Sequence, residues 1–311
     1  MTQVSLTDFA VPPPAYFDEM SGYPYDEKGR RNCEAQAAPY YAAFERNKGA
    51  RRQKLNAIRE KLAPGPVLVS TFNWGFRCLV ENWAASCDRH GIDCRSFTLL
   101  FPMDEEADAF ARGLGFQTYF DGTSYGQQPK EAAGAFGDGK FRMALFAKLA
   151  ATQDMLRIGA DVLRQDVDLV WLRDPRPYLT RRMKCDALDF QFMDDGPNGL
   201  YRPLHLNSGF ACIANTASAR FAWDLVFSNY ARVIHFGSEQ RVINIILCFL
   251  AGRGLRCDRL PEMEFVNGHV IVNALKGSQE MPEGSFVIHA SWTHNLEQKL
   301  ERLKTLGLWY I

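Results

Sequence analysis

Two aspartates, Asp166 and Asp168, stand one residue apart near the middle of the 311-residue chain and interrupt an apolar run that continues to Leu172. Residues two apart on a β-strand share a face, so on a strand these carboxylates project together. Two like charges held that close, away from water, repel unless a cation or a ligand rich in hydrogen-bond donors lies between them. Alternatively, the strand ends here and both carboxylates face water in a turn. The apolar neighbours favour a metal or nucleotide site at the carboxyl end of a strand.

Other polar segments with the potential for chemistry follow further along the chain. A G-x-x-x-x-G-K match at 134–140 has Phe141 where a phosphate-binding loop needs Ser or Thr for magnesium, and no apolar strand precedes it. We interpret that match as an ordinary loop. The segments that remain are Asn207-Ser208-Gly209-Phe210, Glu239-Gln240 with Asn244, and His289-Ala290-Ser291-Trp292.

In this order, the segments resemble the nucleotide-diphospho-sugar transferases that carry a DxD motif. The likeness spans about 67–292 and is greatest to glycosyltransferase family 77, with family 8 as structural relatives. It implies an α/β GT-A fold, which is a Rossmann-like mixed sheet flanked by helices in a single nucleotide-sugar transferase domain. It also implies a UDP-sugar donor, a Mn²⁺ or Mg²⁺ ion, and a hydroxyl-bearing acceptor, with glycan, protein, metabolite and modified nucleic acid all open.

The resemblance assigns Asp168 and His289 as ligands of the cation, and Asp166 as a ligand of the same cation or of the donor's ribose. Carboxylate oxygen and imidazole nitrogen together are a reasonable ligand set for Mn²⁺, and diphosphate oxygens would complete the coordination. Without the resemblance, His289 is more simply a core histidine at the end of a strand.

The resemblance also implies a set of residues that bind the sugar nucleotide. Thr71 and Asn73 would contact the base and ribose, although a strand-end cap explains them as well. Lys148 would reach the phosphates or the sugar, or is one more solvated helix charge. Gly209 would allow close approach of the backbone. The full set is Thr71, Asn73, Lys148, Asp166, Asn207, Ser208 and Gly209.

Both families retain the anomeric configuration, and the resemblance places Gln240 on the β face of the anomeric carbon. An amide is a poor nucleophile, so we predict front-face substitution, in which the leaving phosphate deprotonates the acceptor and Gln240 stabilises the oxocarbenium-like state. Asp194 and Asp195 would hydrogen-bond the hydroxyls of the sugar donor, although turn chemistry explains them almost as well. Glu239 stands where the family often has Asp.

Strands and helices alternate in the first half, which indicates a mostly parallel sheet with ligands bound outside the carboxyl ends of its strands. The predicted strands are 67–73, 94–100 and 116–120, and the predicted helices are 79–90, 104–114 and 141–158. In the second half we predict strands at 186–193, 206–214 and 286–292, helices at 217–230, 239–251 and 298–306, and a turn or flexible loop at 194–199.

The first 62 residues differ from the rest of the chain. Residues 1–37 mix proline, glycine and acidic residues without periodicity and predict an irregular arm, and 39–62 predict a basic helix. We interpret the basic residues of this helix as its solvent-exposed face. Alternatively, they bind an acidic partner. We expect residues 1–62 to pack on one transferase domain at 63–311, with a nucleotide-binding half at 63–175 and an acceptor half at 176–311.

Composition narrows the class of protein. Lys+Arg and Asp+Glu both total 36, so no global field draws the chain onto nucleic acid or an anionic membrane. The eight cysteines are scattered, with no C-x-x-C pair and no zinc-type spacing. No signal peptide is recognisable, and the longest apolar stretch, 242–251, is too short to span a bilayer, so we predict a cytoplasmic protein without a membrane anchor.

Two other functions compete with transfer of a sugar. A degenerate transferase could bind a nucleotide-sugar or a partner without turnover, although clustered carboxylates are costly to keep in a dead site. A haloacid-dehalogenase-like phosphotransferase would use Asp166 and Asp168 in its D-x-D-x-V signature. That signature should follow the first strand and four apolar residues, whereas here it lies past residue 160 behind Arg164 and Gln165.

Overall fold

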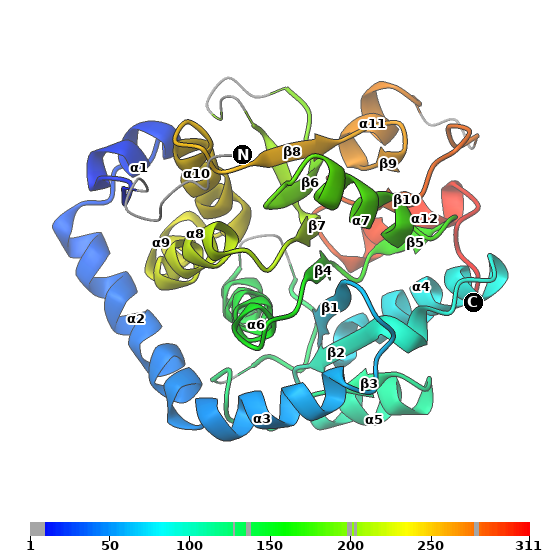
Figure 1. The fold of residues 1–311 in the computed structure, drawn as a ribbon, viewed down its shortest axis with the longest axis horizontal. Coiled ribbons are helices and arrows are strands. Elements are labelled where there is room, and N and C mark those ends of the chain that lie inside the picture. Colours follow the sequence, from blue (N-terminus) through cyan, green and yellow to red (C-terminus); the bar gives the residue numbers. More distant parts are fainter. Residues whose placement is uncertain (1–9, 127, 135–137, 198–200, 202–203, 277–279) are drawn as a thin grey trace.

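Seven strands form the central sheet, in the order β3-β2-β1-β4-β7-β6-β8 (Figure 1). The structure is a computed structural model that describes residues 10–126, 128–134, 138–197, 201, 204–276 and 280–311. Strands β3, β2, β1 and β4 are parallel, β7 is antiparallel to β4 and β6, and β8 is parallel to β6, which confirms a mixed sheet. The bounds are β1 (Val67–Phe72), β2 (Thr98–Pro102), β3 (Gln117–Thr118), β4 (Val162–Gln165), β6 (Phe190–Asp194), β7 (Leu206–Ile213) and β8 (Cys257–Leu260).

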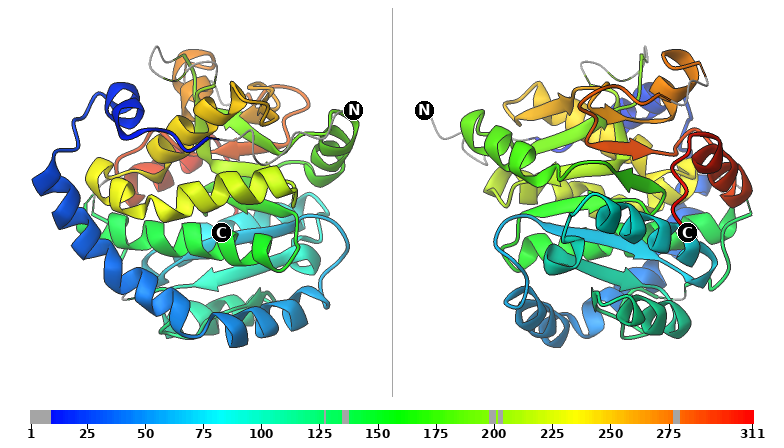
Figure 2. Two further views of the ribbon diagram at one scale, coloured as in Figure 1. Left: turned by 60° about the vertical axis from the view of Figure 1, so that its left-hand side comes forward. Right: turned by 90° about the vertical axis from the view of Figure 1, so that its right-hand side faces the viewer.

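Helices cover both faces of this sheet because its strands are buried on both sides. On β1, Val67 and Val69 pack into one core and Leu68 and Phe72 into the other, as alternation along a strand requires. Figure 2 shows α6 and α8 side by side over the first face. The first face carries α6 (Gly139–Arg157), α8 (Ala217–Ser228), α9 (Tyr230–Phe236) and α10 (Glu239–Ala251), and the second carries α4 (Arg77–Arg89), α5 (Glu105–Gly113) and α7 (Arg176–Cys185).

Most predicted elements lie within a few residues of their expected bounds, but the strand predicted at 94–100 was misplaced. Residues Cys94–Phe97 form a 3-10 helix, with the Thr98 hydroxyl donating to the Cys94 carbonyl at 2.6 Å, and the strand begins at Thr98. Of the 134–140 segment, 135–137 lie outside the described residues and Gly139 begins α6. Of the loop predicted at 194–199, residues 198 and 199 lie outside them as well.

A second, three-stranded sheet, in the order β5-β10-β9, adjoins the first. Strand β4 ends at Gln165 and β5 begins at Leu169, so Asp166 and Asp168 lie in the link between the two sheets. The expectation that both aspartates share one face of a continuous strand was therefore wrong, because the chain leaves the large sheet between them. The remaining elements are β5 (Leu169–Trp171), β9 (Phe265–Val266), β10 (Val287–His289), α11 (Gly268–Asn273) and α12 (Leu296–Thr305).

The irregular arm predicted at 1–37 was also wrong for the residues that the structure describes. Helices α1 (Pro14–Ser21), α2 (Glu27–Arg46) and α3 (Lys48–Arg59) run along one edge of the body, shown in blue in Figures 1 and 2. Pro14 opens α1, where its missing N–H is not needed, and the Asp26 side chain caps α2 by accepting from Gly29 N at 2.7 Å. Among the described residues, no helix has both the length and the apolar character that a bilayer crossing requires.

Candidate active site

Asp166, Asp168 and His289 converge at the junction of the two sheets. One ligand atom from each, two carboxylate oxygens and one imidazole nitrogen, lie within 4.8 Å of one another. Strand β10 places His289 opposite Leu169 in the β5 register, and its Nε2 lies 3.3 Å from Asp168 Oδ1. This donor set suits a divalent cation such as Mn²⁺, so the residues present fit the metal implied by the sequence.

Two lysines neutralise the aspartates. Lys148 Nζ of α6 lies 2.7 Å from Asp166 Oδ1, and Lys299 of α12 forms an ion pair with Asp168. Burial alone would raise the pKa of Asp168, but Lys299 and His289 outweigh burial and hold that pKa well below its usual range. Burial alone would lower the pKa of Lys148, but Asp166 and Glu239 outweigh burial and raise that pKa, so Lys148 is charged at neutral pH.

Gly209 gives His289 the space that it occupies. Between Phe192 and Met193 the β6–β7 register shifts, and β7 there turns its Asn-Ser-Gly run toward the junction. The Gly209 carbonyl accepts from Asp166 N at 2.7 Å, and an added Cβ at Gly209 would lie only 2.9 Å from His289 Nε2 and closer still to Cε1. The sequence predicted close backbone approach at this glycine, and the structure brings the imidazole into that space.

We expect Gly209→Ala to displace the His289 ring and lower affinity for Mn²⁺ by about 10- to 100-fold, the range typical for residues that orient metal ligands. The Mn²⁺ affinity is to be measured by calorimetry, with circular dichroism to verify folding. Gly113→Ala is the matched control, because a Cβ at Gly113 in α5 meets open space. Unchanged Mn²⁺ affinity in the Gly209 variant would contradict the placement of His289 as a ligand.

A cavity of about 470 Å³ opens over these residues. Gln240 and Asp195 lie in its wall together with Asp166 and His289. A neighbouring, smaller cavity of about 110 Å³ shares part of that wall, is lined by Asp168 as well, and extends to the end of β1. The larger cavity is lined by Phe141, Lys148, Asp166, Asp195, Asn207, Ser208, Gly209, Ser238, Glu239, Gln240, His289, Ser291, Trp292, Thr293, His294 and Lys299.

Thr71 and Asn73, predicted to contact the base and ribose, line the smaller cavity. The Asn73 amide donates to the carbonyls of Pro129 and Glu131, both at 2.8 Å, which fixes its orientation. The Asn73 Oδ1 and Thr71 Oγ1 atoms are buried and have no hydrogen-bond partner among the described residues. Buried polar atoms of this kind are normally paired, so these two are available to a polar ligand.

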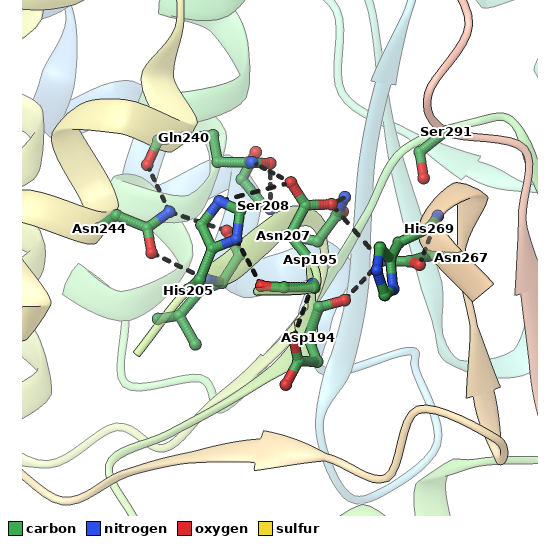
Figure 3. A network of polar contacts seen from close by, with 12 residues as sticks. Asp194, Asp195, His205, Asn207, Ser208, Gln240, Asn244, Asn267, His269 and Ser291 are labelled. Carbon is green, nitrogen blue, oxygen red and sulfur yellow. Dashed lines mark hydrogen bonds and ion pairs between the residues drawn. The ribbon is translucent and has the colours of Figure 1, made fainter. Parts of the chain in front are cut away.

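Asp195 is the centre of a hydrogen-bond network that Figure 3 shows. Its Oδ1 accepts from Asn207 Nδ2 at 2.7 Å and from Trp292 Nε1 at 3.2 Å, and its Oδ2 accepts from Gln240 Nε2 at 2.8 Å. Gln240 Oε1 in turn accepts from Ser208 N at 2.9 Å. Asp195 therefore fixes the orientation of Gln240 and Asn207, a positioning function that its sequence position did not indicate.

Asp194 does not line either cavity described above. It is the last residue of β6, whereas Asp195 lies just beyond the strand and lines the larger cavity. Its side chain accepts from Gly196 N at 2.7 Å and pairs with Arg259 at 2.5 Å. Asp194 therefore stabilises the turn after β6, which was the alternative prediction, and only Asp195 lines the cavity.

Glu239, noted in the sequence only as a replacement for Asp, is a buried residue of the cavity wall. Its Oε1 lies 2.8 Å from Lys148 Nζ and 3.0 Å from Arg164 Nη2, and accepts from Ser208 Oγ at 3.2 Å. Arg164 is itself buried and also donates to the Ser208 carbonyl. In the sequence, the only sign of this network was Arg164, a charged residue just before the DxD motif. The sequence could not show that Glu239 is its partner.

Burial alone would raise the pKa of Glu239, but Lys148 and Arg164 outweigh burial and lower the pKa to about 2 from an ordinary 4.5. A lowered pKa in the folded state means that the ionised carboxylate stabilises the fold above about pH 4.5 and that this stabilisation is lost as pH falls toward 2. We expect Glu239→Gln to lose on the order of 3 kcal/mol of unfolding free energy at pH 7. Urea unfolding measured from pH 7 to pH 2 should show a flatter pH dependence in the variant. Parallel curves would contradict the ion pairing.

Lys299 and Trp292 were also missed as site residues. Lys299 is ten residues beyond His289, on the helix predicted to close the chain, and reaches back to Asp168. The sequence could predict the helix but not which of its faces meets the metal residues. Trp292 was part of the resemblance, yet only the structure shows its side chain at the edge of the cavity.

Comparison with known proteins gives a consistent assignment. The beta-arabinofuranosyltransferase RAY1 of Arabidopsis thaliana is 26% identical over 266 residues, which cover 78% of this chain and 47% of that protein. The UDP-galactose:fucoside alpha-3-galactosyltransferase of Dictyostelium discoideum is 27% identical over 282 residues, which cover 78% of this chain and 43% of that protein. The chain thus spans less than half the length of these curated relatives.

Among solved structures, the apo WbbM bifunctional glycosyltransferase superposes with a TM-score of 0.53 at 12% identity, over 79% of this chain and 51% of that chain. This likeness supports the predicted GT-A fold. Residues 95–303 match the sequence profile of the nucleotide-diphospho-sugar transferases, which is incompatible with the haloacid-dehalogenase-like alternative. On that match over more than half of its length, the chain belongs to the nucleotide-diphospho-sugar transferase family.

Proposed function

We propose that this chain is a metal-dependent retaining glycosyltransferase that moves a pentose or hexose from a UDP-sugar to a hydroxyl acceptor. The observation that carries the proposal is the convergence of Asp166, Asp168 and His289 beside a cavity that also contains Gln240. The similarity to a galactosyltransferase named for UDP-galactose supports a uridine nucleotide. Retention would give an α-linkage from an α-linked sugar donor.

In this proposal, Thr71 and Asn73 offer their unpartnered oxygens to the nucleoside, while Lys148 and Lys299 bring positive charge to the diphosphate. Asp168, His289 and Asp166 would hold Mn²⁺ or Mg²⁺, which supplies positive charge that stabilises the departing diphosphate. Lys148 pairs with Asp166 and Lys299 pairs with Asp168, so the two aspartates hold both lysines in place before the nucleotide binds.

The transfer itself is front-face substitution. The bond between the anomeric carbon and the diphosphate breaks, the acceptor oxygen forms its bond on the same face, and the acceptor proton passes to a diphosphate oxygen. Gln240 is hydrogen-bonded to Ser208 and Asp195, so its amide dipole is fixed before the substrate arrives and costs no reorganisation as positive charge develops on the sugar. The Gln240 amide does not attack the anomeric carbon, because an amide is a poor nucleophile.

Thermal unfolding with UDP- and GDP-sugars, with and without Mn²⁺, tests the proposal. We expect UDP to raise the melting temperature only when metal is present, and UDP-sugars to release free sugar slowly in the absence of an acceptor. Stabilisation without any turnover would instead indicate a binding protein. A covalent glycosyl adduct on a carboxylate of the wild-type chain would disprove front-face substitution.

A further inference from the structure

Trp292 is an exposed aromatic residue in an unfavourable backbone conformation at the edge of the larger cavity. Its side chain lines that cavity, and the residue is 49% exposed. Its φ is 59°, a left-handed value shared by only two other non-glycine residues among those described, Ala187 and Lys276. A bulky side chain is strained in this region, and such strain persists where the surrounding structure enforces it, often at functional sites.

The surroundings of Trp292 do enforce this conformation. Arg302 of α12 donates to the carbonyl of Ser291 and, at 3.2 Å, to the carbonyl of Trp292. Gly268 N donates to Ser291 Oγ at 2.9 Å, and a Cβ on Gly268 would lie 2.6 Å from Trp292 Cβ. The indole also packs edge-on against His269, with ring centroids 5.2 Å apart. An exposed side chain fixed from this many sides is positioned for contact with a ligand.

One carboxylate connects this indole to the proposed reaction centre. Trp292 Nε1 donates to Asp195 Oδ1 at 3.2 Å, and Gln240 Nε2 donates to Asp195 Oδ2 at 2.8 Å. The two side chains are therefore held on opposite oxygens of the same residue. Trp292 does not line the smaller cavity of Thr71 and Asn73, so its ring is not placed to stack on the nucleoside base.

We infer that Trp292 is the platform of the acceptor subsite, and that the acceptor is a glycoside whose ring stacks on the indole. This inference rests on the proposed function. The C–H face of a sugar ring is flat and apolar while its rim is polar, which matches an exposed indole in a cavity wall that also contains the polar side chains of Thr293 and His294. A serine or threonine side chain presents no such face.

Saturation-transfer NMR with methyl glycosides of common hexoses, deoxyhexoses and pentoses tests the inference. Methyl glycosides are used because an aromatic aglycone could itself stack on the indole. Protein, UDP and Mg²⁺ are present throughout, since Mn²⁺ would broaden the signals. We expect transfer to the ring-face protons of at least one glycoside with the wild-type chain, and weakening of that binding by at least about tenfold in Trp292→Gly.

Two variants separate stacking from folding. Trp292→Gly removes the ring and relieves the strain at positive φ, so it should not lose stability, and Trp292→Phe should keep much of the glycoside binding because it keeps a ring. Trp309→Leu removes a partly exposed tryptophan that lines neither of the two cavities and should bind like the wild type. Metal-dependent UDP binding, measured by calorimetry, should be unchanged in all three.

The outcomes distinguish the two proposals. If the wild-type chain binds UDP with metal but no glycoside, or if Trp292→Gly keeps its glycoside affinity, the acceptor assignment is wrong and the proposed function stands. If Trp292→Gly weakens UDP binding but not glycoside binding, the indole belongs to the side of the sugar donor and the assignment is again wrong. If the wild-type chain shows no metal-dependent UDP binding, the proposed function fails and the acceptor assignment fails with it.

Discussion

Replacing Asp168 by Asn will abolish metal-dependent UDP binding and lower sugar transfer by about 10³-fold or more, which is about 4 kcal/mol of transition-state stabilisation. The amide keeps the size of the carboxylate but removes its charge, and with it a metal ligand between Asp166 and His289. It also leaves Lys299 without its ionised partner. The measurements are UDP calorimetry with and without Mn²⁺, and initial rates of sugar release from a UDP-sugar.

Asp186→Asn is the matched control, because it makes the same chemical change in an exposed carboxylate whose side chain is paired with Arg182 at 2.5 Å. We expect this control to leave both measurements unchanged. Removal of metal from the wild-type chain with a chelator should abolish UDP binding and sugar release, as Asp168→Asn does. Added Mn²⁺ should restore both in the wild type but not in the variant. Metal-dependent UDP binding that survives in Asp168→Asn would refute the metal assignment.

The sequence predicted the identity of the candidate metal residues better than it predicted their geometry. Asp166 and Asp168 do converge with His289, but at a link between two sheets rather than on one strand. Residues two apart share a face only as long as both lie in the same continuous strand. Nothing in the apolar run shows where the chain changes sheet, because β4 and β5 are both buried strands separated by only three residues.

The sheet and its covering helices were predictable because their patterns are local. Strand β1 is a short β-branched run before a glycine, and Asp104 precedes α5 as a capping residue that accepts from Ala107 N at 2.8 Å. Helix α2 was misjudged because its polar residues and its internal Pro39 hide the few positions that pack on the body. Its order depends on tertiary contacts, which no local pattern reports.

The site residues that were missed all depend on distant partners. Arg164 is separated by 75 residues from Glu239, and Lys299 by 131 residues from Asp168. Asp194 and Asp195 look equivalent in sequence, but Asp194 pairs with Arg259 whereas Asp195 pairs with Asn207 and Gln240 in the cavity. A motif can therefore identify the chemistry of a site, whereas the residues that neutralise and orient it follow from the fold.

Replacing Asp154 by Ala will lower the unfolding free energy by about 3–5 kcal/mol, the cost of leaving a buried charge without its partner. Asp154 on α6 and Arg51 on α3 have fully buried side chains, with Arg51 Nε 2.5 Å from Asp154 Oδ2. The guanidinium also lies 4.2 Å from the centroid of the Phe44 ring. This ion pair joins α3 to α6, whereas α2 is held by its own buried residues, such as Ala37 and Phe44. Urea unfolding followed by circular dichroism measures the stability that is lost with the pair.

The double variant Arg51→Met/Asp154→Leu separates a buried ion pair from an essential packing contact. Removing both charges leaves no unpaired ion, so we expect it to recover most of the stability lost in Asp154→Ala. Glu34→Ala is the control, because Glu34 pairs with Arg30 at 3.1 Å where both side chains are about half exposed, and its loss should cost less than about 1 kcal/mol. A double variant no more stable than Asp154→Ala would show that the side chains pack specifically. A cost below 1 kcal/mol for Asp154→Ala itself would mean that α3 leaves the body readily and that water reaches Arg51.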